Sequence, residues 1–359
     1  MRDVSGSVVG QSWLLASAGR TPGWLSYAPA MTSLLFLSLS TALAADAAVP
    51  QDDLKPVIIA HRGASGHRPE HTFAAYALGV QMGADYIEPD LVPTADGKLV
   101  ARHDLDLQHS TDAATVWAGR STTRAVDGQT LTGWFTDDFT LAEVQQLKAR
   151  QPRDDRSKEH DGQHAVPTWS DILAWAAAQP RPIGLAPELK HPTHLRARGH
   201  DPVAPFLADL AASGFPHERV WVQCFDVGPL KELDAASDLR LVQLIGHPLH
   251  SPADGGPTYG EMLTRDGLTA IATYADAIGV HKMHLLPVVE GAYAEPSTVV
   301  EDAHAVGLEV HVYTFRDEAS ERPPEEPSAT SELKRFFSLG VDAIFSDHPD
   351  TAVAARRSP

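Results

Sequence analysis

Several charged side chains stand at the ends of apolar runs that have the length of β-strands. Glu88 and Asp90 are two residues apart in such a run, so on an extended strand both side chains project from the same face. Neighbouring carboxylates repel each other unless a cation lies between them. With Glu188, which lies in a later run, they offer the hard oxygen ligands that Ca²⁺ and Mg²⁺ prefer. The alternative is that each carboxylate pairs with an Arg or Lys.

Two histidines and two basic residues stand at comparable positions. His61 and Arg62 follow the run VIIA, and His103 ends the run LVARH. Two imidazoles with pKa values near neutrality can exchange protons with a nucleophile and a leaving group. Arg62 can grip two phosphoryl oxygens, and Lys190 can act on them as a point charge. The pattern predicts proton transfer on an anionic group, and a structural salt bridge is the alternative for the two cations.

The charge balance limits the partners of the chain. Its formal net charge is −18, whereas binding of nucleic acid requires clustered Lys and Arg. We therefore expect a small-molecule substrate, no nucleic acid and no stable membrane insertion; the residues favour no particular oligomeric state. An anionic substrate would need local positive charge from basic side chains or a metal. Cys224 is the single cysteine, so an intramolecular disulfide is excluded.

The N-terminal region predicts export. The stretch MTSLLFLSLSTALAADAA, which begins at Met31, has the length of a signal-peptide core and contains the small-x-small sequence Ala42-Leu43-Ala44. Residues 1–44 are therefore expected to form a signal peptide, and residues 45–359 a periplasmic or secreted domain. An uncleaved anchor is the alternative. Thirty residues precede Met31 and look unlike a normal basic leader, which leaves a misassigned start open.

The rest of the chain alternates short β-rich runs with helical patterns, as in parallel βα units. The predicted strands are 57–60, 85–91, 99–103, 183–190, 220–225, 239–245, 277–281, 308–315 and 341–347. The short turn TADG joins 85–91 to 99–103, so this pair need not have a crossover helix. The remaining count predicts a TIM-type (β/α)8 barrel, in which the carboxyl ends of the strands form the active face.

A long polar segment, residues 104–165, separates the third and fourth predicted strands. We expect it to be an insertion with one helix after Thr140 and otherwise turns. Long loops in compact domains are usually functional or disordered. Trp117, Trp134 and Phe135 predict that this one packs, and that it forms a wall of the site.

Four segments combine these features in a fixed order: HRGASGHRPEHTFAAY, GADYIEPDLVPTADGKLVARHD, PELK and VDAIFSDHP. The ordered set resembles the glycerophosphodiester phosphodiesterase family, whose pattern is H-R-G, P-E-N-T, E-x-D, T-x-D-G, H-D and E-x-K. It is most similar to the long periplasmic branch, and the resemblance spans residues 57–350. His71 departs from the pattern, because it replaces the usual Asn of P-E-N-T.

The resemblance implies a βα barrel that hydrolyses glycerophosphodiesters to sn-glycerol 3-phosphate and an alcohol with one divalent cation, Ca²⁺ being favoured over Mg²⁺. A cyclic phosphate is a conceivable intermediate, because the glycerol C2 hydroxyl lies beside the phosphorus. The site residues that it implies are His61 and His103 for acid–base catalysis, Arg62 and Lys190 for the phosphate, and Glu88, Asp90 and Glu188 for the metal. Gln223, Tyr313 and Phe315 are candidates for the substrate pocket, with core packing as the alternative for Tyr313 and Phe315. By resemblance, His61 is the base and His103 the acid.

Two other functions stay open. A phospholipase of the D or C type would act on intact lipid and should expose apolar loops, whereas these loops are mostly polar. An exported protein that binds phosphodiesters without cleaving them would need the anion site but not two facing histidines.

Overall fold

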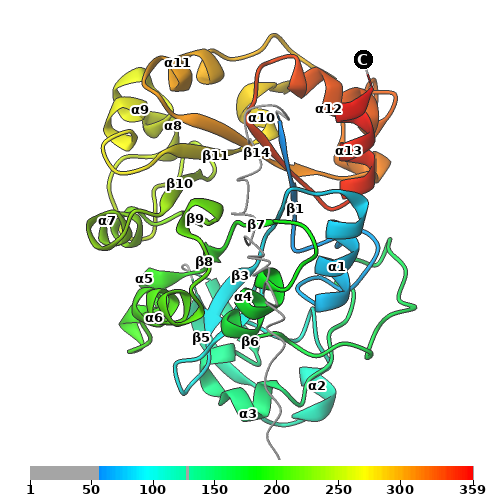
Figure 1. Cartoon of the computed structure of the whole chain (residues 1–359), viewed down its shortest axis with the longest axis vertical. Helices are drawn as coiled ribbons and strands as arrows, with labels where there is room; N and C mark the ends of the chain where they lie inside the picture. Colours follow the sequence, from blue (N-terminus) through cyan, green and yellow to red (C-terminus); the bar gives the residue numbers. More distant parts are fainter. Residues whose placement is uncertain (1–55, 127–128, 359) are drawn as a thin grey trace, which may run out of the picture. The chain divides into compact units, whose positions relative to one another are not determined.

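The computed structural model describes residues 56–126 and 129–358 (Figure 1). The predicted signal peptide lies outside the described residues. Within the described part, no helix combines the length and the apolar character needed to cross a membrane.

The central sheet is a barrel of parallel strands. Its neighbours are, in order, β4 (Leu99–Ala101), β3 (Asp90–Pro93), β8 (Glu188–Leu189), β9 (Trp221–Cys224), β10 (Arg240–Ile245), β11 (Ala277–His281), β14 (Glu309–Phe315), β15 (Ala343–Ser346), β1 (Val57–Ala60), β2 (Tyr86–Ile87) and β7 (Gly184–Leu185). β2 and β3 are the two halves of one interrupted strand, and so are β7 and β8. β2 is hydrogen-bonded to β7, and β3 is hydrogen-bonded to β8. If each interrupted strand is counted once, the described residues form eight parallel barrel strands, called staves below, which confirms the predicted TIM-type barrel.

Prolines interrupt the two divided staves. Pro89 separates β2 from β3, and Pro187 separates β7 from β8. Proline has no N–H to donate to a strand ladder, so it breaks regular pairing. The two interrupted strands nevertheless remain paired at this point, because Glu188 N donates to Pro89 O at 3.0 Å. Both interruptions therefore fall next to the carboxylates Glu88 and Glu188.

β4 runs antiparallel to β3, with Leu91 opposite Ala101 and Pro93 opposite Leu99. A turn and not a crossover helix joins them, as the short TADG link predicts. This geometry brings the end of β4, and His103 after it, back to the carboxyl edge of the barrel.

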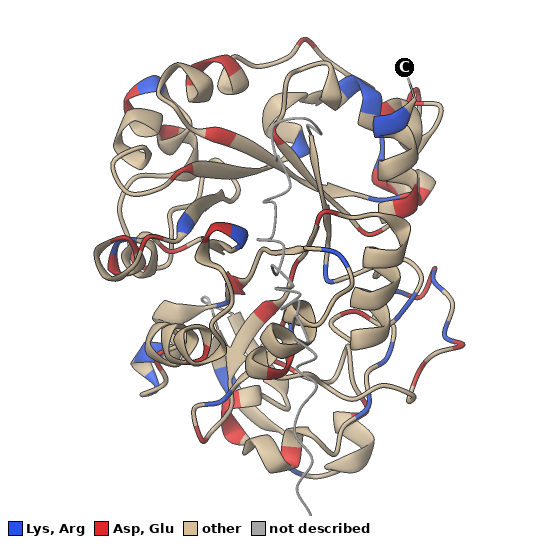
Figure 2. Ribbon diagram, in the orientation of Figure 1, with Lys and Arg blue, Asp and Glu red and all other residues tan. Residues whose placement is uncertain are grey.

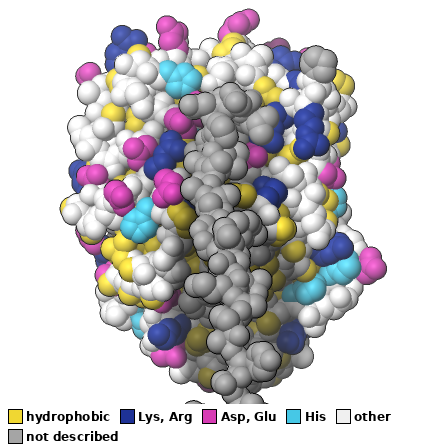
Figure 3. All heavy atoms as spheres, in the orientation of Figure 1, with side chains coloured by type: hydrophobic (Ala, Val, Ile, Leu, Met, Phe, Trp, Pro, Cys, Tyr) yellow, Lys and Arg dark blue, Asp and Glu magenta, His cyan; other side chains and the backbone are white. Residues whose placement is uncertain are grey.

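Helices connect the staves and lie around them (Figure 1). They are α1 (Phe73–Met82), α4 (Trp169–Ala177), α5 (Pro192–Ala197), α6 (Val203–Ser213), α7 (Val227–Ala236), α8 (Tyr259–Met262), α9 (Arg265–Ile271), α10 (Lys282–Leu285), α11 (Val299–Ala305), α12 (Ala329–Phe337) and α13 (Pro349–Arg357). A small hairpin, β12 (Val288–Val289) and β13 (Ala292–Tyr293), follows α10. Acidic and basic residues are both spread over these helices and their connecting loops (Figure 2). On the face drawn in Figure 3, Lys and Arg side chains are interspersed with Asp and Glu.

Adjacent strand residues serve two different cores, because side chains alternate across a strand. Ile58 and Ile344 belong to the larger core, which also includes helical side chains such as Trp169. Ile59 and Phe345, one position further along the same strands, belong to a smaller cluster. Members of this smaller cluster reach the cavity described below.

The loop after β1 passes close to α1 at Gly63. Gly63 has a φ of +83°, and a Cβ there would lie 2.6 Å from the backbone carbon of Ala75. Only glycine accommodates both conditions without strain. α1 itself begins at Thr72, whose hydroxyl accepts a hydrogen bond from Ala75 N at 3.1 Å. The H-R-G glycine therefore lets the backbone beside His61 and Arg62 lie directly against the helix.

The insertion is more ordered than the sequence predicts. It contains α2 (Ala113–Val116), a hairpin of β5 (Thr122–Val126) and β6 (Gln129–Gly133), a 3₁₀ turn at Thr136–Asp138 and α3 (Leu141–Val144). The helix after Thr140 is confirmed, with Thr140 and Glu143 forming a capping box. The expectation of turns elsewhere is wrong for the short helix α2 and for the hairpin, whose threonine-rich strands are mostly exposed.

The three aromatic residues of the insertion do pack. Trp117 stacks on Phe139 with ring centroids 3.9 Å apart, and the Trp134 indole N–H donates to Trp117 O at 2.8 Å. Phe135 is fully buried in the same cluster, which also takes in Val92 and Val100 of the barrel. The hydrophobic core of the insertion therefore includes apolar side chains of β3 and β4.

Candidate active site

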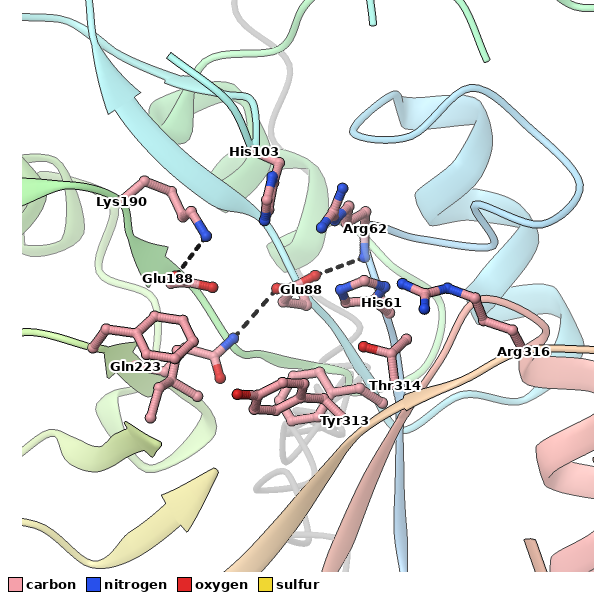
Figure 4. A pocket seen from close by; sticks show the side chains of 13 residues that line it. His61, Arg62, Glu88, His103, Glu188, Lys190, Gln223, Tyr313, Thr314 and Arg316 are labelled. Atoms are coloured by element: carbon pink, nitrogen blue, oxygen red, sulfur yellow. Dashed lines mark hydrogen bonds and ion pairs between the residues drawn. The ribbon is translucent and has the colours of Figure 1, made fainter. Parts of the chain in front are cut away.

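A cavity of about 230 Å³ opens at the carboxyl ends of the staves (Figure 4). Its lining residues are His61, Arg62, Glu88, His103, Glu188, Lys190, Gln223, Phe225, Leu244, Tyr313, Thr314, Arg316 and Phe345. They come from seven of the eight staves and from β4. The structure thus brings together charged side chains and histidines from distant parts of the chain, as the sequence predicts. The predicted wall from the insertion is not formed: residues 104–165 are absent from this lining.

Three buried carboxylates face one another beside this cavity. One oxygen each from Glu88, Asp90 and Glu188 lies within 4.8 Å of the other two. Desolvation and the charge of Asp90 raise the pKa of Glu88 well above its usual range, and desolvation raises the pKa of Glu188 to about 8. Ionising all three together is therefore costly unless a cation lies between them.

The charge and hydrogen bonding of Asp90 differ from those of the two glutamates. Desolvation opposes its charge, but Lys190 and a hydrogen bond from His71 hold the pKa of Asp90 well below its usual range. Its Oδ1 is buried and has no hydrogen-bond partner among the described residues. An unpartnered anionic oxygen facing two further carboxylates is a donor set that fits a hard divalent cation.

Two cations flank the carboxylates, so the predicted alternative of ion pairing is also partly realised. Arg62 donates from its backbone N to Glu88 at 2.7 Å and from its guanidinium to Glu70 at 3.0 Å. Lys190 Nζ lies 2.8 Å from Glu188 Oε1. Burial opposes both charges, but the neighbouring carboxylates outweigh it and raise the pKa of Arg62 and of Lys190. Both residues thus stay positive and can meet an anionic ligand.

His61 is paired with a buried aspartate. Its Nδ1 lies 2.5 Å from Asp347 Oδ1, and Arg316 Nε donates to the other oxygen of Asp347 at 2.8 Å. Desolvation lowers the pKa of His61 to about 4 despite the neighbouring Asp347, so the ring is neutral at neutral pH. A carboxylate accepts but does not donate, so Nδ1 carries the hydrogen and Nε2 is left as a proton acceptor. This is the tautomer that a general base requires.

His103 has a similar arrangement at the rim of the cavity. Its Nδ1 lies 2.6 Å from Asp104 Oδ1, and its side chain is partly exposed. Desolvation and the charges of Arg62 and Lys190 lower the pKa of His103 to about 4. An anionic phosphate beside these two cations would offset their charge and raise the pKa of His103, which is the condition for an acid.

The remaining wall includes two of the three predicted pocket residues. Gln223 Nε2 lies 3.4 Å from Glu88 Oε1, and the Tyr313 hydroxyl donates to Ile245 O at 2.6 Å. Phe315 does not line the cavity and is a correction to the prediction. The register of β14 shifts between Val312 and Phe315, so that the Phe315 ring turns into the core, 5.0 Å from the ring of Phe336.

His71, the departure from P-E-N-T, lies behind the carboxylates. It is fully buried with a φ of 52°, in the left-handed region that Asn tolerates more readily than most residues. Its Nε2 lies 2.9 Å from Asp90 Oδ2, and its Nδ1 lies 3.1 Å from the Tyr76 hydroxyl. The imidazole of His71 therefore bridges Asp90 and Tyr76 with its two ring nitrogens.

Sequence reasoning missed several members of the site. Arg316 and Asp347 each follow or end a predicted strand, so the rule that identified His61 could have found them. Asp104 follows His103 directly. Phe225, Leu244 and Phe345 carry no charge, and among apolar strand residues nothing in the sequence distinguishes cavity wall from core.

The sequence of the chain is similar to those of known proteins. The chain matches the sequence model of the Glycerophosphoryl diester phosphodiesterase family over residues 61–351. It is 31% identical over 316 residues to glycerophosphodiester phosphodiesterase GDPD6 of Arabidopsis thaliana, with 83% of this chain and 85% of that protein covered. It is 28% identical to the glycerophosphodiester phosphodiesterase of Haemophilus influenzae, with 83% and 88% covered.

The fold is similar to that of solved structures. An Oleispira antarctica phosphodiesterase, solved in complex with the product sn-glycerol-3-phosphate, superimposes with a TM-score of 0.59. The match covers 84% of this chain and 97% of that one, and the two sequences are 20% identical. At this identity the likeness concerns the barrel alone.

Proposed function

Because the chain belongs to the glycerophosphoryl diester phosphodiesterase family and is a phosphodiester hydrolase, we propose that it converts glycerophosphodiesters, the deacylated forms of phospholipids, to sn-glycerol 3-phosphate and an alcohol. The proposal rests mainly on one observation: two histidines and three basic side chains line a single cavity, and a cluster of three facing carboxylates lies beside it. These side chains come from different strands that are far apart in the sequence, and the barrel brings their ends together.

The phosphate would lie between Arg62 and Lys190, which supply the local positive charge that a chain of net charge −18 requires. Glu88, Asp90 and Glu188 are the proposed ligands of one divalent cation, with Ca²⁺ favoured and Mg²⁺ as the alternative. When bound, this cation would supply Lewis-acid charge that offsets negative charge on the phosphoryl oxygens.

The two histidines divide the proton transfers. His61, with Nε2 as acceptor and Nδ1 fixed by Asp347, takes the proton of the nucleophile. His103, at the rim where the alcohol can depart, donates the proton that the leaving oxygen requires. Each transfer is local, so neither histidine needs to exchange protons with the other during the reaction.

The nucleophile in the proposed route is the glycerol C2 hydroxyl. Its oxygen bonds to phosphorus as the bond from phosphorus to the alcohol oxygen breaks; His61 receives the hydroxyl proton and His103 protonates the alcohol. Water then attacks phosphorus as the bond from phosphorus to the C2 oxygen breaks; His103 receives the proton of the water, and His61 returns its proton to the C2 oxygen, which releases sn-glycerol 3-phosphate. An intramolecular nucleophile has a large effective concentration, which favours this route over direct attack by water.

We expect a cyclic phosphate signal in phosphorus NMR spectra recorded during turnover, and slow hydrolysis of a 2-deoxy substrate that lacks the attacking hydroxyl. Magnesium- or calcium-loaded enzyme and glycerophosphocholine provide the reference reaction. Brisk hydrolysis of the 2-deoxy compound without a cyclic signal would instead favour attack by water.

Replacing Lys190 by alanine should lower kcat/KM by about 10- to 100-fold on every glycerophosphodiester alike, because a hydrogen bond to a charged group contributes about 1.5–3 kcal/mol. The lysine is proposed to contact the phosphate, which all these substrates share. Steady-state kinetics with choline, ethanolamine and glycerol headgroups measure the effect. A loss confined to one headgroup would reassign Lys190 to headgroup recognition.

Release of sn-glycerol 3-phosphate, followed with a coupled glycerol-3-phosphate dehydrogenase, tests the proposed function. Glycerophosphocholine should give the dehydrogenase signal, and intact phosphatidylcholine should not. Turnover of the intact lipid would favour a phospholipase. Tight binding of glycerophosphocholine without product would favour a binding protein. Export to the periplasm or medium remains a proposal supported by the leader sequence, and N-terminal sequencing of the mature protein tests it.

A further inference from the structure

An arginine of the insertion reaches the back of the active site. Arg156 lies in the polar run between α3 and α4, yet its side chain is 5% exposed. Its NH2 donates to Asp347 Oδ2 at 2.6 Å, and its Nε donates to Glu318 Oε1 at 2.6 Å. The two partners lie 191 and 162 residues further along the chain. A charged side chain buried this deeply is normally retained by paired, hydrogen-bonded neighbours, as here.

The two carboxylate oxygens of Asp347 have different partners, His61 on one side and two arginines on the other. Oδ1 lies against His61 Nδ1 at 2.5 Å, whereas Oδ2 accepts from Arg156 at 2.6 Å and from Arg316 at 2.8 Å. Arg316 also lines the cavity and contacts Glu321, so it is shared among several groups. Arg156 contacts Asp347 but is not among the residues that line the cavity.

We infer that Arg156 is a positioning residue of the active site: by fixing Asp347 it sets the orientation and tautomer of His61, so that the insertion takes part in catalysis without touching substrate. The inference rests on the proposed function of His61. Two charge-assisted contacts join the three residues, one from Arg156 to Asp347 and one from Asp347 to His61.

A purely structural role for Arg156 is the competing explanation. Its NH1 donates to Ser65 O at 3.3 Å, and the Ser65 hydroxyl in turn donates to His61 O at 2.8 Å. The insertion is also anchored there by Gln151, whose Nε2 donates to Ser65 O at 2.9 Å. Loss of Arg156 could therefore loosen the loop after β1 instead of releasing Asp347.

Arg153 supplies a matched control. It lies three residues before Arg156 and pairs with Glu321 at 2.8 Å and with Asp155 at 2.9 Å. Arg153 thus ties the same segment of the insertion to the same 3₁₀ turn, Ala319–Glu321, but has no contact with Asp347 among those the structure shows. Arg153→Gln removes a cation of the insertion and leaves both direct donors to Asp347, Arg156 and Arg316, in place.

In kinetics with glycerophosphocholine, Arg156→Gln should lower kcat by about 10- to 100-fold with little change in KM, as is typical when a group that orients a catalytic histidine is lost. Arg153→Gln should stay within about twofold, since a partly exposed ion pair contributes little. Arg156→Lys should recover part of the loss. Equal losses in Arg156→Gln and Arg153→Gln would overturn the inference.

A double-mutant cycle with Asp347→Asn separates positioning from loop support. If Arg156 acts through Asp347, adding Arg156→Gln to Asp347→Asn should cause almost no further fall in kcat, because interacting residues are not additive. Multiplication of the two losses would show that Arg156 acts through the loop and would overturn the inference. Thermal unfolding of all variants identifies any that fail to fold, and the Arg156→Lys variant then carries the comparison.

Nitrogen-15 NMR of the histidine side chains gives a readout that needs no turnover. Wild type and Arg153→Gln should show His61 as the Nδ1–H tautomer with a strongly downfield hydrogen-bonded proton, and Arg156→Gln should show a mixture of tautomers or loss of that signal. An unchanged His61 spectrum in Arg156→Gln would refute the positioning role. If the wild type has the expected spectrum but does not hydrolyse glycerophosphodiesters, the proposed function fails and the positioning geometry stands.

Discussion

The His103→Ala variant should lose about 10²- to 10⁴-fold in kcat on glycerophosphocholine yet hydrolyse a glycerol p-nitrophenyl phosphodiester at a substantial fraction of the wild-type rate. Choline oxygen is a poor leaving group and needs a proton from His103. The p-nitrophenolate anion is stable without one, so removal of the acid should matter little. Steady-state kinetics with both substrates measure the difference.

The His61→Ala variant should instead be slow on both substrates, because the nucleophile must lose its proton whichever group departs. His67 provides a control: its imidazole pairs with Asp350 at 3.1 Å and does not line the cavity, so His67→Ala should retain activity. If His61→Ala is the variant rescued by p-nitrophenolate, the two roles are reversed. If neither substitution reduces turnover of the natural substrate, the acid–base pair is wrong.

Exhaustive treatment with EDTA should abolish activity, and added Ca²⁺ or Mg²⁺ should restore it. The proposed cation would supply the positive charge that offsets negative charge on the phosphoryl oxygens, and its removal leaves Glu88, Asp90 and Glu188 facing one another without it. EDTA saturated with Ca²⁺ in advance is the control for effects of the chelator itself. Full activity after chelation would exclude the proposed metal site.

Asp90→Asn should weaken cation binding directly, because it replaces the carboxylate that keeps its charge with a neutral amide of the same shape. Terbium luminescence in the absence of substrate measures this affinity apart from turnover. Asp106→Asn is a suitable comparison, since Asp106 is a buried acid of the insertion outside the carboxylate cluster. Equal terbium affinity in wild type and Asp90→Asn would remove Asp90 from the ligand set.

The barrel was predictable because its signal is local. Each of the nine predicted segments contains a strand, and the short link between residues 91 and 99 correctly indicated a pair without a crossover helix, which the structure shows to be antiparallel. The hairpin of the insertion was not predictable in this way. Its strands pair with each other and not with the barrel, so they need no apolar face and give no periodic pattern.

The site was predictable only in part, for the same reason. Residues within the ordered motifs, such as His61 in H-R-G and Glu88 in E-x-D, can be recognised from their neighbours in the sequence. Arg156 lies in a run of charged residues where nothing singles it out, and its importance comes from Asp347, 191 residues away. Phe315 was misplaced because spacing of two residues assumes a regular strand, and β14 is irregular at that point.

The most direct test of this account is a crystal structure with Ca²⁺ and sn-glycerol 3-phosphate. We expect one cation between Glu88, Asp90 and Glu188, with the phosphate between that cation, Arg62 and Lys190. A cation bound elsewhere, or a phosphate outside the cavity that these residues line, would contradict it.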